Sequence, residues 1–163
     1  MKKERMMAIA TIGIDLGKNS CSLAGLDETG AVVLRRRFTR ERLVAFLAGQ
    51  PACVVAMEAC GGAHFWGREI GKLGHEVRLI PPAYVKPFVK RQKNDMADAE
   101  AIAEAASHPT MRFVAVKSEA QQAAAMAYRT RNLLVRQRTQ TINAFRAHLA
   151  EQGIASAAYM AGN

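Results

Sequence analysis

The sequence is poor in several residue types, and each shortage excludes a class of protein. Only three cysteines occur among 163 residues, and no two of them form a CxxC pair. This argues against a disulfide framework and predicts reduced thiols in a cytosolic protein. No apolar run is long enough for a signal peptide or a membrane span. We therefore expect a cytoplasmic, nucleoid-associated protein with no membrane contact.

Acidic residues are also scarce. Fourteen Asp and Glu stand against 23 Lys and Arg, so the formal charge is +9, and the sequence pI is about 9.9. Such a surface favours a polyanionic partner, because it binds phosphates and releases counterions. A basic protein without such a partner is the alternative. Only four of the acids are aspartates: Asp15, Asp27, Asp95 and Asp98.

Residues 8–18, A-I-A-T-I-G-I-D-L-G-K, form the stretch around which the chain is organised. Its β-branched residues are nearly contiguous, which predicts a strand buried on both faces. Asp15 then lies at the end of a buried strand, where a carboxylate is costly unless it is paired, for example with a metal ion. Alternatively, Asp15 only caps the strand end and Gly17 opens a hairpin.

The rest of the first two thirds predicts an α/β protein. Two antiparallel strands follow the first, joined by a turn at 27–30 in which Gly30 supplies a positive φ. Thr39 is a plausible helix N-cap. Strands then alternate with helices, which indicates a sheet with mixed pairing. We expect strands at 21–26, 31–38, 52–57 and 75–80, and helices at 39–48 and 63–73.

The last third predicts helices. Asn94 is a plausible N-cap for an Ala-rich helix at 95–106, and 111–116 is a short extended piece. One long helix at 118–152 would extend ~50 Å. Its apolar positions are only partly heptad-like, so by itself it predicts a weak coiled coil. We therefore divide the chain into a domain at 1–117, a long basic dimerising helix at 118–152 and a tail at 153–163.

Four carboxylates are expected to converge. The first strand should lie beside the strand ending at Met57, which brings Asp15 near Glu58, and Asp95 and Asp98 share one helix face. Repelling carboxylates need a cation between them. Alternatively, Glu58 caps the next helix, and the two helix aspartates only complement its dipole. Helical periodicity favours Asp98 over Glu100 as the fourth member.

Oxygen-only ligands suit Mg²⁺ or Mn²⁺. Two such ions ~3.5–4 Å apart can stabilise an in-line displacement at a phosphodiester. The basic run before the 95–106 helix would deliver the phosphates to the metals. The candidate nucleic-acid contacts are Lys18, Lys86, Lys90, Arg91 and Lys93, with Arg129, Arg131, Arg136 and Arg138 on the long helix.

Three motifs carry a family resemblance. They are I-G-I-D-L-G-K at 12–18, V-V-A-M-E-A at 54–59 and K-N-D-M-A-D-A-E-A-I at 93–102. Together they resemble the N-terminal domain of bacterial insertion-sequence transposases that act as bridge-RNA-guided recombinases. The resemblance covers residues 8–155, including R-A-H-L-A-E-Q-G-I at 146–154 in the long helix. The fold it implies is ribonuclease-H-like (RuvC-like), a mixed sheet with flanking helices, followed by a coiled-coil-type helix.

The resemblance also implies a function. The family's Asp-Glu-Asp-Asp tetrad falls on Asp15, Glu58, Asp95 and Asp98 as Mg²⁺ ligands. The long helix would join subunits into a homo-oligomer and contact nucleic acid, with DNA and a structured guide RNA as partners. Full-length members continue into a domain with a nucleophilic serine, which this chain does not reach, and Ser156 is not assigned that role. We therefore expect a DNA transposase domain that is incomplete without that serine.

Three alternatives remain. I-G-I-D-L-G is also similar to the first phosphate loop of actin and heat-shock ATPases, although the second glycine-rich motif of that superfamily is missing. A stand-alone RuvC-like junction nuclease would cleave branched DNA by itself. A non-catalytic regulator derived from a truncated transposase would bind nucleic acid without cleaving it.

Overall fold

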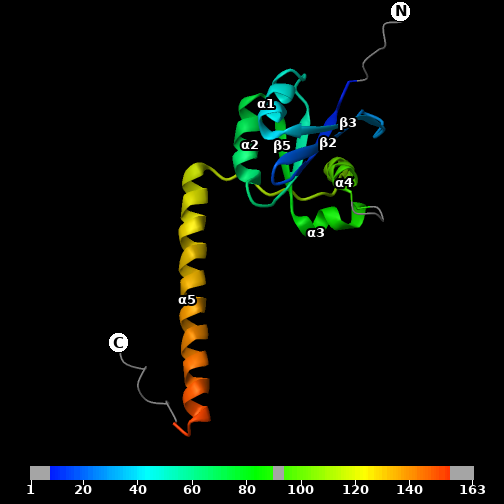
Figure 1. Cartoon of the computed structure of the whole chain (residues 1–163). Coiled ribbons are helices and arrows are strands. Elements are labelled where there is room, and N and C mark those ends of the chain that lie inside the picture. The colour runs from blue at the N-terminus through cyan, green and yellow to red at the C-terminus, as the bar shows by residue number, and fades with distance from the viewer. Residues whose placement is uncertain (1–7, 90–93, 155–163) are drawn as a thin grey trace, which may run out of the picture. The chain divides into compact units, whose positions relative to one another are not determined.

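The computed structural model describes residues 8–89 and 94–154. The chain divides into two compact units, Met1–Ser118 and Glu119–Asn163. The first contains the sheet and its helices, and the second contains one long helix (Figure 1).

The first unit is built on a five-stranded sheet with the order β3-β2-β1-β4-β5. The two hairpin partners, β2 and β3, extend the sheet from β1 in antiparallel pairing, whereas β4 and β5 run parallel to β1 on its other side. The mixed sheet predicted from the sequence is therefore confirmed. The strands are β1 (Thr11–Leu16), β2 (Ser20–Leu26), β3 (Val32–Thr39), β4 (Val54–Glu58) and β5 (Glu76–Ile80).

Helices follow the strands as the sequence pattern indicates, with one addition. The predicted helices are α1 (Arg40–Ala48), α2 (Ala63–Lys72), α4 (Asp95–Ser107) and the long α5 (Glu119–Glu151). The addition is a pair of short turns after β5, α3 (Pro82–Val85) and the 3₁₀ helix η1 (Lys86–Phe88). Both have a proline near the start. Proline is tolerated at that position, but turns this short show no periodic pattern in the sequence.

Two of the predicted caps have different outcomes. Asn94 caps α4 as expected, because its side chain accepts a hydrogen bond from the Met96 amide at 3.1 Å. Thr39 occupies the N-cap position of α1, as predicted, but its side chain makes no cap hydrogen bond. Gly30 has the predicted positive φ of 83° in the β2–β3 turn.

The central strands of the sheet are buried on both faces, as the apolar first strand predicted for itself, whereas the edge strand β3 is largely exposed. In β4, Val55 and Met57 belong to a core cluster that includes Leu43 of α1 and Ile70 of α2. Ala56, between them, belongs to a second cluster that includes Ile102 of α4. Successive residues of a strand point to opposite faces, so α1 and α2 cover one face and α4 covers the other.

Gly13 lets α4 lie directly on β1. A Cβ atom at Gly13 would be 2.2 Å from the carbonyl oxygen of Ala99 and 2.5 Å from the amide nitrogen of Ala103. Only glycine leaves room for a helix backbone at such a distance. The alanines of α4 are the matching small residues, and Ala99 and Ala103 are fully buried.

In the second unit, α5 is the helix that the described residues form, and none of its residues is buried. Its large apolar side chains are exposed, including Met126, Tyr128, Leu134 and Phe145. Within the described ranges, no helix is both long enough and apolar enough to cross a membrane.

Candidate active site

Strand pairing brings two of the predicted carboxylates to one edge of the sheet. In the parallel β1–β4 pair, Ile14 lies opposite Met57. Asp15 and Glu58 are the next residues on each strand, so they emerge side by side at the carboxyl ends of β1 and β4. This juxtaposition is the one expected from the sequence.

Helix α4 brings a third carboxylate to the same edge. Asp95 and Asp98 lie in its first turn. Because α4 packs against β1 at Gly13, that turn lies over the strand ends. Asp98 lines a cavity of about 200 Å³ together with Asp15 and Glu58. The remaining walls come from the segment after β5: Pro82, Val85, Lys86 and Val89.

Asp95 is beside this cavity but does not line it. Its Oδ2 accepts a hydrogen bond from Arg37 Nη2 of β3 at 3.2 Å, and both side chains are exposed. Three of the four predicted carboxylates therefore share the cavity, and the fourth is paired with a cation at its margin. In the part of the chain that the structure describes, no three His, Cys, Asp or Glu side chains are grouped as ligands for one metal ion.

The carboxylates nonetheless act on one another electrostatically. The pKa of Asp15 is raised to about 6 from 3.8, first by burial and then by the negative charges of Asp98, Asp95 and Glu58. Arg37 opposes this shift because its positive charge favours the ionised form of Asp15. The site therefore concentrates negative charge, and a bound cation would relieve the repulsion.

Glu100 points away from the site, in agreement with the helical periodicity. It forms an ion pair with Arg35 of β3. Arg35 and Arg37 lie two apart on one strand, so both reach α4 from the same face of β3. The sequence alone did not identify these two arginines as partners of α4. The signal was present in the R-R-R run at 35–37, but their partners lie about 60 residues further along the chain.

The predicted nucleic-acid contacts are distributed over both units. Lys86 lines the carboxylate cavity, and Lys18 is exposed in the loop after β1. Lys90, Arg91 and Lys93 lie outside the described residues. On α5 the four arginines Arg129, Arg131, Arg136 and Arg138 are exposed.

The chain is similar to several curated transposases. It is 51% identical over 149 residues to the transposase for insertion sequence element IS1328 of Yersinia enterocolitica, covering 91% of this chain and 45% of that protein. It is 50% identical over 148 residues to a probable family 20 transposase of Pseudomonas aeruginosa, covering 91% of this chain and 44% of the relative. The transposase for IS1111A of Coxiella burnetii is 42% identical over 156 residues, which cover 96% of this chain and 43% of the relative. The chain thus spans less than half the length of these relatives.

Among solved structures, T. thermophilus RuvC in complex with a Holliday junction substrate resembles this chain with a TM-score of 0.46 and 15% identity, over 65% of this chain and 99% of that one. The family model DEDD_Tnp_IS110, described as a transposase, matches residues 12–153, which include all four predicted carboxylates. The chain therefore belongs to the DEDD transposase family of IS110-type insertion sequences.

Proposed function

We propose that this chain is the catalytic N-terminal part of a DNA transposase that binds Mg²⁺ or Mn²⁺ and acts on DNA phosphodiesters. The observation that carries the proposal is the cavity lined by Asp15, Glu58 and Asp98 with Lys86 at its wall. Acidic side chains that converge within an otherwise basic protein suit a cation and a polyanion together.

The donor set fits a hard divalent cation. Asp15, Glu58 and Asp98 offer only oxygen atoms, which Mg²⁺ and Mn²⁺ prefer. Burial, and after it the neighbouring carboxylates, raise the pKa of Asp15, and a bound cation would favour its ionised form. When bound, such ions stabilise the attacking and leaving oxygens of a phosphodiester. Asp95 would become the fourth carboxylate ligand if it released Arg37 and bound the cation instead.

The chain's own cations would hold the substrate. Lys86 lies in the wall of the cavity, where its ammonium can meet a DNA phosphate. Arg37 is next to the cavity through Asp95, and its guanidinium can form paired hydrogen bonds with phosphate oxygens. Both residues would therefore position the backbone without reading its sequence.

The relatives contain a further region that this chain does not match. As the family resemblance implies, that region would supply a nucleophilic serine for the covalent step, and a structured guide RNA would select the target. A stand-alone junction nuclease and a non-catalytic regulator are the competing functions, and both predict different results in the same experiment.

We further propose that α5 joins subunits and contacts nucleic acid. Tyr128, Val135, Ile142 and Leu149 recur at seven-residue spacing, which places them on one side of the helix. None of them is buried within the chain. Arg131 and Arg138, also seven apart, are available for phosphates.

The test is Mn²⁺ binding by calorimetry together with nicking of supercoiled plasmid. The chain is compared with an Asp15→Ala, Asp95→Ala double variant. Glu104→Gln, an exposed change on α4, serves as the matched control. We expect binding by the wild type and the control and at least tenfold weaker binding by the double variant, with no nicking by any of them.

Each alternative result has a defined meaning. Nicking by the wild type and the Glu104→Gln control, but not by the double variant, would identify a self-sufficient nuclease. Equal Mn²⁺ binding by wild type and double variant would show that the carboxylates are structural and would refute the metal site. DNA binding without any Mn²⁺ binding would favour the regulator.

A further inference from the structure

A second cavity, of about 300 Å³, lies on the other side of the segment that walls the carboxylate site. Tyr84, Pro87 and Phe88 line this second cavity, whereas Pro82, Val85, Lys86 and Val89 of the same segment line the first. One short stretch of α3 and η1 thus separates the two. A ligand that extends over this stretch can occupy both.

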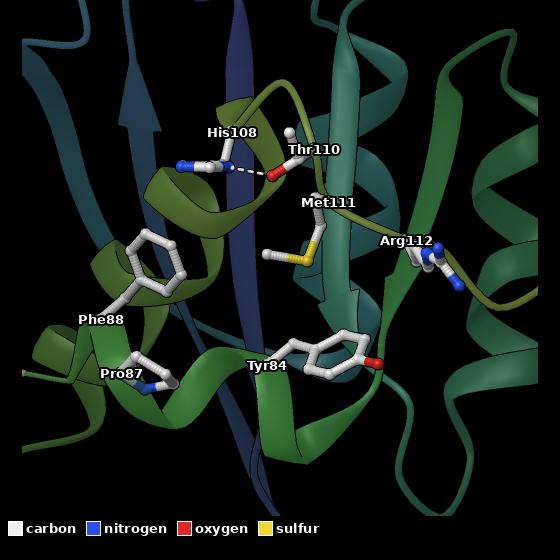
Figure 2. A pocket seen from close by; sticks show the side chains of 7 residues that line it. All are labelled: Tyr84, Pro87, Phe88, His108, Thr110, Met111 and Arg112. Carbon is white, nitrogen blue, oxygen red and sulfur yellow. Dashed lines mark hydrogen bonds between the residues drawn. The ribbon is translucent and has the colours of Figure 1, made fainter.

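Flat and polarisable side chains surround the second cavity (Figure 2). The rings of Phe88 and His108 meet edge to face, with their centroids 6.0 Å apart. Tyr84 lies across the cavity from His108, and the Met111 side chain extends between them (Figure 2). This lining offers ring faces and a thioether, which suit a flat aromatic ligand.

Polar groups are placed at the rim. Thr110 Oγ1 is 3.1 Å from His108 Nδ1, within hydrogen-bonding distance of the imidazole ring. Arg112 is exposed at one side of the cavity (Figure 2). A flat apolar interior with a guanidinium at its edge matches a base attached to a phosphate, because each part of that ligand finds its complement.

One side of the cavity is formed by residues packed on the core, and another side is exposed to solvent. Phe88 and Met111 pack against the core cluster that contains Ile102 and Val85. Tyr84, in contrast, has 46% of its surface exposed. An aromatic ring that is held at the mouth of a cavity but left uncovered is the arrangement on which single-stranded bases stack.

We propose that this cavity binds one unpaired nucleobase of the strand whose phosphate is held at the carboxylate site. The choice of ligand rests on the proposed function, since a nucleic-acid strand held at Asp15 and Lys86 can continue over α3 and η1 into the adjacent cavity. Stacking requires only a base face, so the site accepts DNA or RNA bases with little sequence preference.

The experiment is fluorescence anisotropy with a labelled short oligodeoxythymidylate and with an abasic oligomer of the same length, in EDTA and at fixed salt. Tyr84→Ala is expected to weaken binding of the intact oligomer roughly 5- to 150-fold, the range that corresponds to the loss of one base–aromatic stack. The abasic oligomer should bind Tyr84→Ala and the wild type equally well. Tyr84→Phe should restore affinity, because it keeps the ring.

Phe65→Ala is the matched control, since Phe65 is also an exposed aromatic residue (48%) but does not line the cavity. Tyr84 is exposed, so its truncation should leave the melting temperature within a few degrees, and melting is measured for every variant. An oligouridylate run in parallel shows whether the base comes from DNA or RNA.

Two results would overturn the proposal. One is equal binding of the intact oligomer by wild type and Tyr84→Ala. The other is equal weakening for the intact and the abasic oligomer, which would place Tyr84 on the backbone. Both leave the metal-dependent function standing. Conversely, base-dependent binding by a chain that binds no Mn²⁺ would keep the base site and refute the catalytic proposal.

Discussion

At the scale of single residues, the ionised form of Asp15 lowers the stability of the folded chain. Its folded pKa of about 6 lies above the ordinary value of 3.8, so the folded state holds this proton more tightly than the unfolded state. The contribution of Asp15 to stability is therefore favourable at low pH and is lost as pH rises through the window from 3.8 to about 6. Above that window the ionised carboxylate opposes folding.

Asp15→Asn should therefore raise the melting temperature in metal-free buffer at pH 8, by a few degrees, and have little effect at pH 4. Mg²⁺ should raise the melting temperature of the wild type but not that of the variant, because a ligand stabilises only a state that binds it. Scanning calorimetry at both pH values checks this. If Asp15→Asn were less stable than the wild type at pH 8, the interactions lost with the carboxylate would outweigh the repulsion that its charge causes.

His75 is a second residue with a defined role, remote in sequence from its partners. It is 6% exposed. Its Nε2 is 2.9 Å from the Leu47 carbonyl, and its Nδ1 accepts from the Cys53 amide at 3.3 Å. The ring thus connects the end of α1 to the segment before β4.

His75→Ala should destabilise the fold by about 1–3 kcal/mol, because the Cys53 N–H loses its partner. Urea unfolding measures this change, with His148→Ala, a change on the solvent-accessible α5, as the control. Equal midpoints for the two variants would contradict the role given to His75.

At the scale of elements, the contact between β1 and α4 decides where Asp98 lies. Gly13→Ala would place a methyl group 2.2 Å from the Ala99 carbonyl oxygen, so α4 must move. Overpacking of this kind costs about 1–3 kcal/mol. We expect Gly13→Ala to have a lower unfolding midpoint. We also expect it to bind Mn²⁺ more weakly even where the protein is fully folded, because Asp98 moves with α4.

Gly71→Ala is the matched control for Gly13→Ala. Nothing lies within 4 Å of a Cβ at Gly71, which is in α2. This change should be neutral or stabilising by up to about 1 kcal/mol, since alanine favours a helix over glycine. Unaltered Mn²⁺ affinity in Gly13→Ala would mean that α4 does not set the metal site.

At the scale of the whole molecule, the exposed α5 gives a prediction about assembly. If Val135, Ile142 and Leu149 form the seam between two copies, Ile142→Asp should shift the chain from dimer to monomer. A buried unpaired carboxylate at a helix seam is strongly unfavourable. Gln137→Asp adds the same charge at an exposed position and should leave the dimer intact. Sedimentation equilibrium distinguishes these outcomes, and a monomeric wild type would refute the seam.

The net charge of +9 gives a prediction about nucleic-acid binding. Replacing Arg131 and Arg138 by Ala should lower affinity for duplex DNA and reduce the slope of log affinity against log salt by about 0.9 for each phosphate that is no longer neutralised. Lys72→Ala, which removes a charge already paired with Glu69, should change the slope less. An unchanged slope in the double variant would exclude α5 from phosphate binding.

The amino-acid sequence alone was enough to predict the main elements and the pairing of β1 with β4, because buried strands and capped helices leave local patterns. The run of β-branched residues before Asp15 marked a strand covered on both faces, and Asn94 marked the start of α4. The juxtaposition of Asp15 and Glu58 followed from parallel pairing alone. Asp98 was preferred to Glu100 by helical periodicity, and the structure places Asp98 in the cavity.

Features that depend on distances between remote segments required the folded structure. Folding paired Asp95 with Arg37 and formed two short turns at 82–88 with a cavity on each side. Neither could be predicted, because an ion pair between side chains 58 residues apart and a turn of three or four residues leave no periodic signal. The close approach of α4 at Gly13 is of the same kind: the sequence shows a glycine, and only packing shows what the missing Cβ makes room for.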